Sequence, residues 1–425
     1  MKSLFGIVSA ALVCGSACLA QEEVAMRSLF NGKDLTGWKG NGYVVEDGAI
    51  VCKPEGDNLN LFTEETFANY VLEFEFLLTP GANSGLGIHY PGTGDGAYTG
   101  MELQILDSKD PKYKDLKDYQ FHAGLYTLKA AKQGFLKPVG EWNRERVTVN
   151  GSSLTIEVNG NTALTADLNE VSASHPEHVG VKRRAGHIGW MGHGDKVSFR
   201  NIQIGELPPA VDEEGIKAAG FTKIFDGSSL AGWKHEPDIT NWLASNGILK
   251  HTGKPGPTKD LWTEKSYKDF ILVCVWRWSG RGPMKSQPVV LPDGSSKENA
   301  EVEELDSGAY LRGDTKSQVN FWNWTVGSGE VYGYRTDSKM SAEVKAGVTP
   351  KAKADKPLGE WNHTMITMKA DRLTVTLNGQ TVIENAQLPG IPEKGPIGLQ
   401  HHGAAIDFAN IWIKELPTDQ LPSER

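Results

Sequence analysis

The feature that most constrains the fold of this chain is an internal duplication. The phrase LFNGKDLTGW returns later in the chain as IFDGSSLAGW. Two further pairs follow in the same order: GEWNRERVTVNGSSLTIEVNG with GEWNHTMITMKADRLTVTLNG, and GHIGWMGHGDKVSFRNIQI with GPIGLQHHGAAIDFANIWI. The spacing between paired blocks varies, so the copies differ by loop insertions. We therefore expect one domain used twice and not a solenoid, whose repeats are much shorter.

The boundary between the copies falls in the segment PPAVDEEGIKAAG, which opens on two prolines and is acidic. We place the first domain at residues 27–207, a linker at 208–220 and the second domain at 221–417. Each copy then has the length of an ordinary domain.

Both copies carry the alternation of β-strands. Segments such as VSFRNIQI and IDFANIWI alternate apolar and polar residues, while Asn159-Gly160 and Asn378-Gly379 are typical of tight hairpin turns. Helical patterns are scarce. The fold class is therefore all-β, with each copy expected to be an antiparallel sandwich of two sheets.

The N-terminus predicts export. Lys2 precedes the apolar run LFGIVSAALVCGSACLA, and polar residues follow. This pattern is typical of a signal peptide spanning residues 1–20, cleaved after Ala20 or alternatively near Ala25. The run is too short for a comfortable membrane span, so we expect a periplasmic or extracellular protein with no membrane span.

The cysteines favour a protein without disulfides. Cys14 and Cys18 lie in the predicted signal peptide, where lipidation is the alternative to simple cleavage. Cys52 and Cys274 fall in different copies, within strand-like apolar runs, and are expected to be buried free thiols.

The net charge of −9 argues against a nucleic-acid partner, because acidic residues are spread along the chain and no basic stripe is present. The charge indicates nothing about oligomeric state.

Both copies resemble the 3-keto-disaccharide hydrolase family. The resemblance rests in copy one on LFNGKDLTGW, NSGLGIHY, MELQILD, GLY, GEWN, VNG and HGDKVSFRNIQI, and in copy two on IFDGSSLAGW, DSGAYLRG, VYGY, GEWN, LNG, LQHHG and FANIWI. It covers nearly the whole mature chain. It implies two tandem concanavalin A-like jelly rolls, each with a groove on its concave face, and a hydrolase acting on 3-keto-glycosides or related glycans.

A ketone at C3 makes the C2 proton acidic, so a base can remove it and the resulting enolate can expel the substituent at C1. Addition of water then completes a hydrolysis. Such a site needs a base, a hydrogen-bond donor or cation at the enolate oxygen, and a proton donor for the leaving oxygen. It does not need the two flanking carboxylates of an ordinary glycosidase.

Copy one carries side chains suited to these roles. Glu102 and Gln104 in MELQILD are two residues apart, so on a strand they share one face, while Met101, Leu103 and Ile105 point into the core. We expect Glu102, His89 and His193 to be catalytic and to line one pocket. The alternatives without a catalytic role are that Glu102 is a solvated acid on its strand and that His193, which is flanked by glycines, is a turn residue. The predicted substrate-binding residues of copy one are Gln104, Asp107, His122 and Arg183.

A bound divalent metal is conceivable, because acidic and histidine side chains are available, with Glu102 as a possible ligand. No HExxH motif, paired histidines or cysteine cluster indicates one.

Copy two lacks a counterpart of the acid in MELQILD. Its nearest segment, SQVNFWNW, places Gln318, Asn320, Trp322 and Trp324 on one face. Amides beside aromatic rings suit a sugar, so Asn320, Trp322 and His402 are predicted to bind substrate. The alternative is a tryptophan-rich core, which would also include Trp276 and Trp278.

The acids of NAEVEELDSGAY form either a second site or a solvated charged run. They are Glu301, Glu303, Glu304 and Asp306.

The repeated opening phrase is expected to serve the scaffold, with Trp38 and Trp233 closing the end of each sandwich. Three functions then remain open: an exported glycoside hydrolase, a non-catalytic carbohydrate-binding protein, and an adhesive module that binds no sugar. Convergence of acidic and imidazole groups favours the first.

Overall fold

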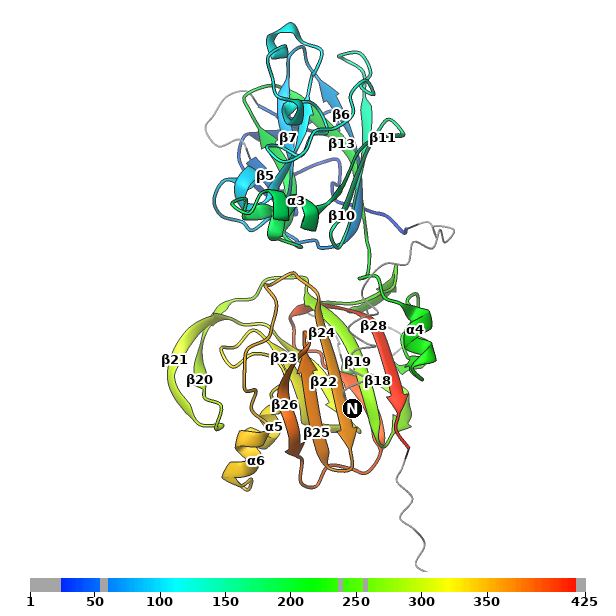
Figure 1. Cartoon of the computed structure of the whole chain (residues 1–425), viewed down its shortest axis with the longest axis vertical. Coiled ribbons are helices and arrows are strands. Elements are labelled where there is room, and N and C mark those ends of the chain that lie inside the picture. Colours follow the sequence, from blue (N-terminus) through cyan, green and yellow to red (C-terminus); the bar gives the residue numbers. More distant parts are fainter. Residues whose placement is uncertain (1–23, 54–59, 236–239, 255–258, 418–425) are drawn as a thin grey trace, which may run out of the picture. The chain divides into compact units, whose positions relative to one another are not determined.

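The computed structural model describes residues 24–53, 60–235, 240–254 and 259–417. The chain divides between Pro209 and Ala210 into two compact units. In each unit the regular secondary structure consists mostly of antiparallel strands (Figure 1). The predicted signal peptide lies outside the described residues. Among the described residues, no helix has the length and apolar character needed to cross a membrane.

The first domain stacks a sheet of eight strands on a sheet of five. The larger has the order β11-β10-β9-β6-β13-β4-β3 with β1 paired to β13, and the smaller has the order β2-β5-β12-β7-β8. The strands are β1 Arg27–Ser28, β2 Trp38–Gly40, β3 Tyr43–Glu46, β4 Ala49–Cys52, β5 Asn60–Thr63, β6 Tyr70–Leu78, β7 Asn83–Tyr90, β8 Met101–Leu106, β9 Asn143–Asn150, β10 Ser153–Val158, β11 Asn161–Asp167, β12 His187–Gly192 and β13 Val197–Glu206.

Short helices link these strands. They are α2 Gly96–Thr99, η1 Pro111–Tyr113, η2 Asp118–Gln120, α3 Leu168–Ser174 and η3 Gly180–Lys182.

The second domain repeats both sheets. Its eight-stranded sheet has the order β16-β17-β28-β19-β24-β25-β26 with β14 paired to β28, and its five-stranded sheet has the order β15-β18-β27-β22-β23. The strands of these two sheets are β14 Thr222–Lys223, β15 Trp233–Lys234, β16 Trp242–Ser245, β17 Ile248–Thr252, β18 Leu261–Tyr267, β19 Phe270–Trp278, β22 Asp306–Leu311, β23 Asp314–Trp322, β24 Asn362–Lys369, β25 Arg372–Leu377, β26 Gln380–Gln387, β27 Gly395–Leu399 and β28 Ala405–Glu415.

The second domain also has a hairpin that the first lacks. It consists of β20 Met284–Val290 and β21 Ser296–Glu303, and it projects from the sandwich between β19 and β22 (Figure 1). Three helices complete the part of the chain from Ala210 that the structure describes: α4 Glu213–Ala218, α5 Tyr332–Arg335 and α6 Ala342–Gly347. The all-β, two-sandwich prediction is confirmed.

Alternation along the strands explains why each sheet has an inner and an outer face. On β6, Phe74 and Phe76 are buried in the core. Glu73, the residue before Phe74, faces outward and pairs with the guanidinium groups of Arg144 and Arg146 on β9. The inner apolar residues stabilise the domain, because burial of each large apolar side chain contributes about 2–3 kcal/mol. The exposed ion pairs contribute little.

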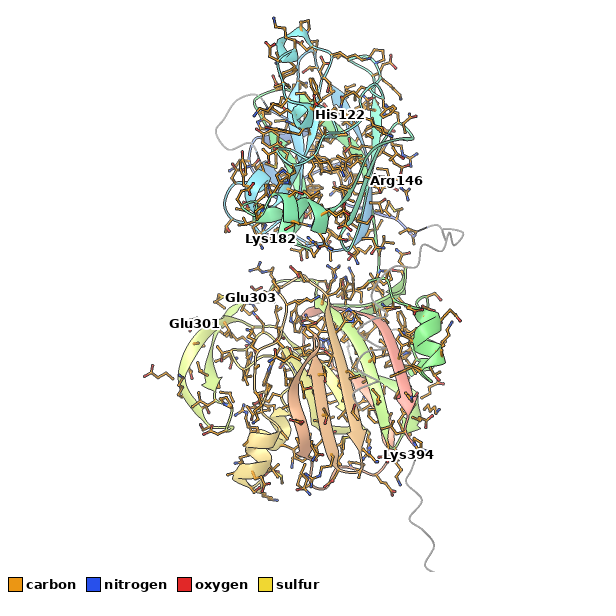
Figure 2. The ribbon with its side chains drawn as sticks, viewed as in Figure 1. His122, Arg146, Lys182, Glu301, Glu303 and Lys394 are labelled. Carbon is orange, nitrogen blue, oxygen red and sulfur yellow. The ribbon has the colours of Figure 1, made fainter. Side chains whose placement is uncertain are left out.

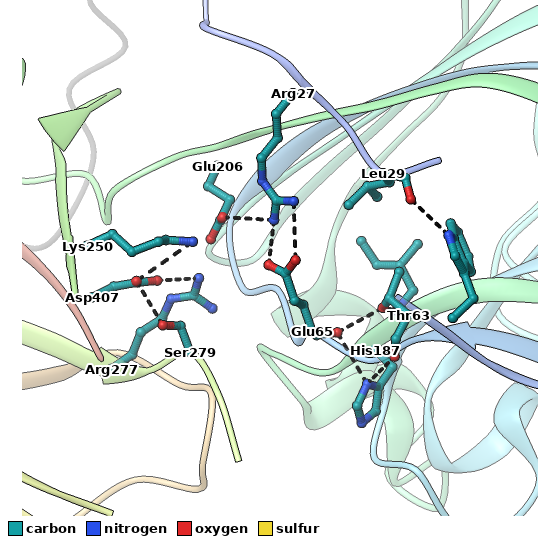
Figure 3. A network of polar contacts seen from close by, with 12 residues as sticks. Arg27, Leu29, Thr63, Glu65, His187, Glu206, Lys250, Arg277, Ser279 and Asp407 are labelled. Carbon is teal, nitrogen blue, oxygen red and sulfur yellow. Dashed lines mark hydrogen bonds and ion pairs between the residues drawn. The ribbon is translucent and has the colours of Figure 1, made fainter. Parts of the chain in front are cut away.

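The tryptophans of the repeated phrase are structural in both domains. Trp38 and Trp233 are buried. The indole N–H of Trp38 donates to the carbonyl oxygen of Leu29 at 2.8 Å, and that of Trp233 donates to the carbonyl oxygen of Ile224 at 2.8 Å. Figure 3 shows the first of these bonds. The phrase repeats because this anchoring of the first strand repeats.

Ion pairs brace each domain at different places (Figure 3). In the first domain, Arg27 of β1 pairs with Glu65 at 2.5 Å and with Glu206 at 3.6 Å. In the second domain, Arg277 and Asp407 form a buried pair at 2.7 Å. A buried pair of this kind is costly to break on one side, because the remaining charge loses its partner.

The other predicted features of the core are present. Cys52 and Cys274 are buried free thiols. Trp276 is fully buried, stacks on Phe321 with ring centroids 4.7 Å apart, and donates its indole N–H to Thr364. The tryptophan-rich core is therefore the correct interpretation of the Trp276–Trp278 pair.

Candidate active site

Glu102 lies on the face of the five-stranded sheet that points away from the core of the first domain. Its neighbours along β8, Met101 and Leu103, are 0% exposed in the core. Glu102 and Gln104 therefore share the opposite face, as the alternation predicts. Both are nevertheless covered, because Glu102 is only 3% exposed and Gln104 only 5%.

A glycine on the neighbouring strand makes room for the Glu102 carboxylate. Gly87 is paired with Glu102 across β7 and β8, and Gly85 with Gln104. A Cβ atom on Gly85 would lie 2.0 Å from Oε1 of Glu102. The carboxylate thus lies directly over the backbone of β7, which only glycine allows.

His193 completes a carboxylate–imidazole pair. It follows β12, and its Nε2 lies 3.2 Å from Oε1 of Glu102. The Glu102 side chain is 3% exposed, whereas that of His193 is 43% exposed. The Glu102 carboxylate is therefore buried, while the imidazole of His193 is open to solvent.

The environment of His193 favours its charged form. The hydrogen bond to Glu102 raises the pKa of His193, and the charges of Asp195 and Asp95 add to this, against the opposing effect of burial. A raised pKa means that His193 stays an imidazolium, and so a proton donor, to higher pH than a free histidine.

An apolar patch lies beside the pair. Phe62 and Tyr90 stack with ring centroids 4.2 Å apart. Met191 and Ala97 are buried with Phe62, and Tyr126 packs against the same cluster. The backbone N–H of Tyr126 donates to the carbonyl oxygen of Glu102 at 2.9 Å.

The sequence-based prediction missed this apolar patch. The alternating glycines of NSGLGIHY and the tyrosine of GLY were the available signals, because they mark where backbone and rings crowd around the acid.

The expectation that His89 joins this pair is wrong. Residue 89 has a φ of +53°, which reverses the alternation of β7 at its end. The ring is 0% exposed, its Nδ1 lies 3.1 Å from the carbonyl oxygen of Arg183, and it packs edge-on against Tyr70. Arg312 has the same φ of +53° just after β22 and binds Asp269 at 2.9 Å. In both domains, a buried polar side chain therefore fills the end of the five-stranded sheet at this position.

His89 should instead make the first domain sensitive to acid. Burial lowers its pKa from 6.5 to about 4, helped by the charges of Arg184 and Arg183. The unfolded chain therefore takes up a proton near pH 6.5 that the folded chain does not, so stability is complete above pH 6.5 and falls as pH drops toward 4. The loss amounts to about 3 kcal/mol.

We expect His89→Asn, which tolerates positive φ, to flatten this pH dependence in denaturant titrations at pH 7 and pH 4.5. An unchanged slope would contradict the account.

His122 does not lie on the Glu102 face either. It is buried between the sheets of the first domain, with Nε2 3.3 Å from a carboxylate oxygen of Glu145 on β9. Its Nδ1 accepts the backbone N–H of Leu106 at 3.3 Å. His122 thus connects the two sheets and is not accessible to a substrate.

Asp107 and Arg183 also lie apart from the pair. Asp107 accepts the backbone N–H of Gly81 at 2.9 Å. The Nε of Arg183 donates to the carbonyl oxygen of Thr99 at 2.7 Å. Both side chains therefore bind backbone groups of loops. Their predicted contact with substrate is not supported by these positions.

The second domain places its predicted residues differently. Asn320 lies on β23 and is 4% exposed. Trp322 is 2% exposed and stacks on Trp324 with centroids 4.1 Å apart, covered by Val290 and Val302 of the inserted hairpin. Trp322 is therefore buried, and its prediction as a sugar platform is wrong.

His402 remains accessible, with 53% of its side chain exposed.

Two of the hollows in the described part of the first domain lie away from the Glu102–His193 pair. One, of about 600 Å³, lies on the outer face of the eight-stranded sheet around Glu73 and Arg146. The other, of about 250 Å³, lies between Asp107 and Lys137. Neither includes Glu102 or His193. In the described part of the chain, no group of three or more His, Cys, Asp or Glu side chains is placed to hold a metal ion.

The Glu102–His193 bond can be tested directly. Replacing Glu102 by glutamine removes the negative charge that raises the pKa of His193. We therefore expect the pKa of His193 to fall in Glu102→Gln, as followed by NMR titration of the ring protons. A pKa that does not move would mean that the two side chains are not bonded in solution.

Comparisons with known proteins agree with this architecture. The model of the 3-keto-alpha-glucoside-1,2-lyase-like domain matches residues 25–205 and again 220–414. A 3-keto-disaccharide hydrolase of Bacteroides thetaiotaomicron is 28% identical over 224 residues, covering 42% of this chain and 77% of the relative.

Solved structures also match. A protein of Parabacteroides distasonis assigned to the glycosyl hydrolases has 26% identity and a TM-score of 0.39, covering 43% of this chain and 94% of its own. A Bacillus subtilis protein with a galectin-like fold has 13% identity and a TM-score of 0.30, covering 44% and 97%. The two matched segments span most of the chain, which therefore belongs to the 3-keto-alpha-glucoside-1,2-lyase-like family of hydrolases and contains two copies of its domain.

Proposed function

We propose that the chain is an exported hydrolase that cleaves 3-keto-glycosides by elimination across C1 and C2, followed by hydration. The observation that carries this proposal is the 3.2 Å bond between Glu102 and His193 on the face of the five-stranded sheet. The names of the matched family and of the Bacteroides relative both specify a 3-keto sugar, and the family name specifies a 1,2-lyase. Elimination across C1 and C2 is the chemistry that a ketone at C3 permits.

In the first half-reaction, Glu102 acts as the base. Its carboxylate removes the C2 proton, and the electron pair forms an enolate with the C3 ketone. The C1–O bond then breaks, and His193, as an imidazolium, gives its proton to the leaving oxygen. The products of this step are an unsaturated 3-keto sugar and the free second sugar.

The second half-reaction reverses the proton transfers. Neutral His193 takes a proton from water as the oxygen adds to C1, and protonated Glu102 returns a proton to C2. Glu102 ends as a carboxylate and His193 as an imidazolium, so the pair is regenerated and the sum is hydrolysis.

Neighbouring groups suit the rest of the sugar. The side-chain oxygen of Gln104 is buried without a hydrogen-bond partner among the described residues, and Gln104 lies on the same face as Glu102. Its amide can bind a hydroxyl or the enolate oxygen. Tyr90 and Tyr126 provide ring surface for the sugar's apolar side.

Export is part of the proposal and rests on the first 20 residues. Mass spectrometry of the protein from its native host should find a mature N-terminus at Gln21 or shortly after Ala25. An intact Met1 would contradict export by cleavage.

The function is tested by incubating purified protein with a 3-keto-disaccharide and measuring release of the second sugar. The same disaccharide without the ketone is the control, because its C2 proton is not acidic. We expect release from the keto sugar alone. Release from both would indicate an ordinary glycosidase, and release from neither would overturn the proposal.

A further inference from the structure

The two domains can be matched residue by residue through hydrogen bonds that recur in both. The Ser84 hydroxyl donates to the carbonyl oxygen of Met191, and the Ser307 hydroxyl donates to that of Gln400. Gln400 of the second domain therefore occupies the position of Met191 in the first.

The strand that carries Glu102 is matched in the same way. The backbone N–H of Gln104 donates to Gly124 in the first domain, and that of Asn320 donates to Glu330 in the second. Two residues earlier, Gln318 thus stands where Glu102 stands. An amide of nearly the same shape has replaced the base.

Gln318 sits in a row of hydrogen-bonded side chains. Its Nε2 donates to Oε1 of Gln400, and Nε2 of Gln400 lies 3.2 Å from Nδ1 of His402. In the first domain a carboxylate is hydrogen-bonded to an imidazole. In the second domain the side-chain amides of Gln318 and Gln400 form a chain of contacts that ends at the imidazole of His402. Amides that donate and accept are suited to recognising hydroxyl groups.

A carboxylate nevertheless lies beside this row. Oδ2 of Asp306 is 3.6 Å from Nε2 of His402, which is beyond hydrogen-bond reach. Oδ1 of Asp306 is buried with no hydrogen-bond partner among the described residues. The side chain is 13% exposed, and Glu304 and Lys285 are the other charged groups that act on it. Asp306 thus places a partly exposed carboxylate, not hydrogen-bonded to His402, next to an exposed imidazole.

Aromatic rings complete the face. Trp262, Gly398, Tyr310 and Gln318 are paired in one line across β18, β27, β22 and β23. The rings of Trp262 and Tyr310 are nearly parallel, with centroids 5.3 Å apart. The six-membered ring of Trp262 lies over Gly398, where a Cβ would come within 2.8 Å of it. Trp262 remains partly exposed.

The inserted hairpin gives this face a boundary that the first domain lacks. It enters directly before Asp306 and carries Glu301 and Glu303 on β21 (Figure 2). Its Gln287 donates to a carboxylate oxygen of Glu304. The insertion therefore places new polar groups at one side of the Asp306–His402 pair.

We propose that the second domain holds a separate binding site for a neutral saccharide, which it recognises without cleaving. The partly exposed ring of Trp262 packs against the apolar side of a pyranose. The carboxylate of Asp306, whose side chain is partly exposed, and Nε2 of His402 bind adjacent hydroxyl groups. This inference depends on the proposed function in one respect only, which is the choice of a disaccharide as the ligand.

Binding without cleavage follows from the exchanged residues. The position of the base holds Gln318, whose amide cannot remove a proton from carbon. The carboxylate that is present, Asp306, is not hydrogen-bonded to the imidazole. The site keeps groups that orient hydroxyls and has lost the bonded acid–imidazole pair.

The test is the binding of cellobiose, an unoxidised disaccharide, to the full-length protein by saturation-transfer NMR and tryptophan fluorescence titration. Trp262→Ala and Asp306→Asn should each weaken binding by roughly tenfold or more, because each removes one principal contact. Glu384→Gln, an exposed acid on β26 in the other sheet of the same domain, is the matched control and should bind as the wild type does.

The outcomes separate this inference from the proposed function. Absence of cellobiose binding, or binding that survives both substitutions, overturns the inference. If Asp306→Asn rather than Glu102→Gln abolishes cleavage of a 3-keto-disaccharide, the second face is catalytic and the inference is likewise overturned. Cellobiose binding that depends on Trp262, in a protein that cleaves no 3-keto-disaccharide, would support the inference while the proposed function fails.

Discussion

The Glu102→Gln protein should cleave 3-keto-disaccharides with a kcat reduced by about 100- to 10,000-fold, the usual contribution of a positioned general base. Glutamine keeps the shape of the side chain and can still lie over Gly85, so the fold should be unchanged. The loss should fall on kcat more than on KM, because the carboxylate acts on the C2 proton in the transition state.

The control for this substitution is Glu157→Gln on the outer face of the first domain. Glu157 lies 3.6 Å from Arg146 and has no part in the candidate site. It should retain wild-type kcat, and both variants should unfold at the wild-type temperature. A Glu102→Gln enzyme that keeps its full rate would remove Glu102 from the mechanism.

Gly85→Ala should lower kcat by roughly tenfold to a hundredfold, since misplacement of a reacting group by about 1 Å is enough for such a loss. The added Cβ would lie 2.0 Å from Oε1 of Glu102, so the carboxylate must move away from β7 and from His193. The nearest atoms to this Cβ all belong to the Glu102 side chain, so the backbone of β7 is not forced to shift.

A double-mutant cycle isolates this effect. If Gly85→Ala acts only by displacing the carboxylate, it should cost almost nothing further in the Glu102→Gln background. Equal losses in both backgrounds would mean that the glycine matters for another reason, such as the stability of the sheet.

The doubled sandwich could be predicted from the sequence because the signals that indicate it are local and occur in both copies. Strand alternation, Asn-Gly turns and three recurring blocks each reflect the scaffold. Glu102 and Gln104 were correctly assigned to one face for the same reason, since a period of two needs no knowledge of distant residues.

The remaining site assignments depended on features that alternation does not encode. The positive φ at His89 turns its ring into the core. The contact with Glu145, on β9 of the eight-stranded sheet, holds the ring of His122 between the two sheets. The inserted hairpin covers Trp322, and only the fold brings Val290 and Val302 over that ring. Each is a long-range contact or a backbone reversal, which the residue pattern does not reveal.

The central claim is that the first domain cleaves its substrate by removing and replacing the proton on C2. It is tested most directly by running the hydrolysis of a 3-keto-disaccharide in D₂O and examining the 3-keto product by NMR at early times. A parallel sample of that product alone corrects for spontaneous exchange. Deuterium at C2 in step with cleavage is the predicted result. Cleavage that neither exchanges the C2 hydrogen with solvent nor slows when that hydrogen is replaced by deuterium in the substrate would contradict the account, because buried Glu102 could otherwise return the proton that it removed.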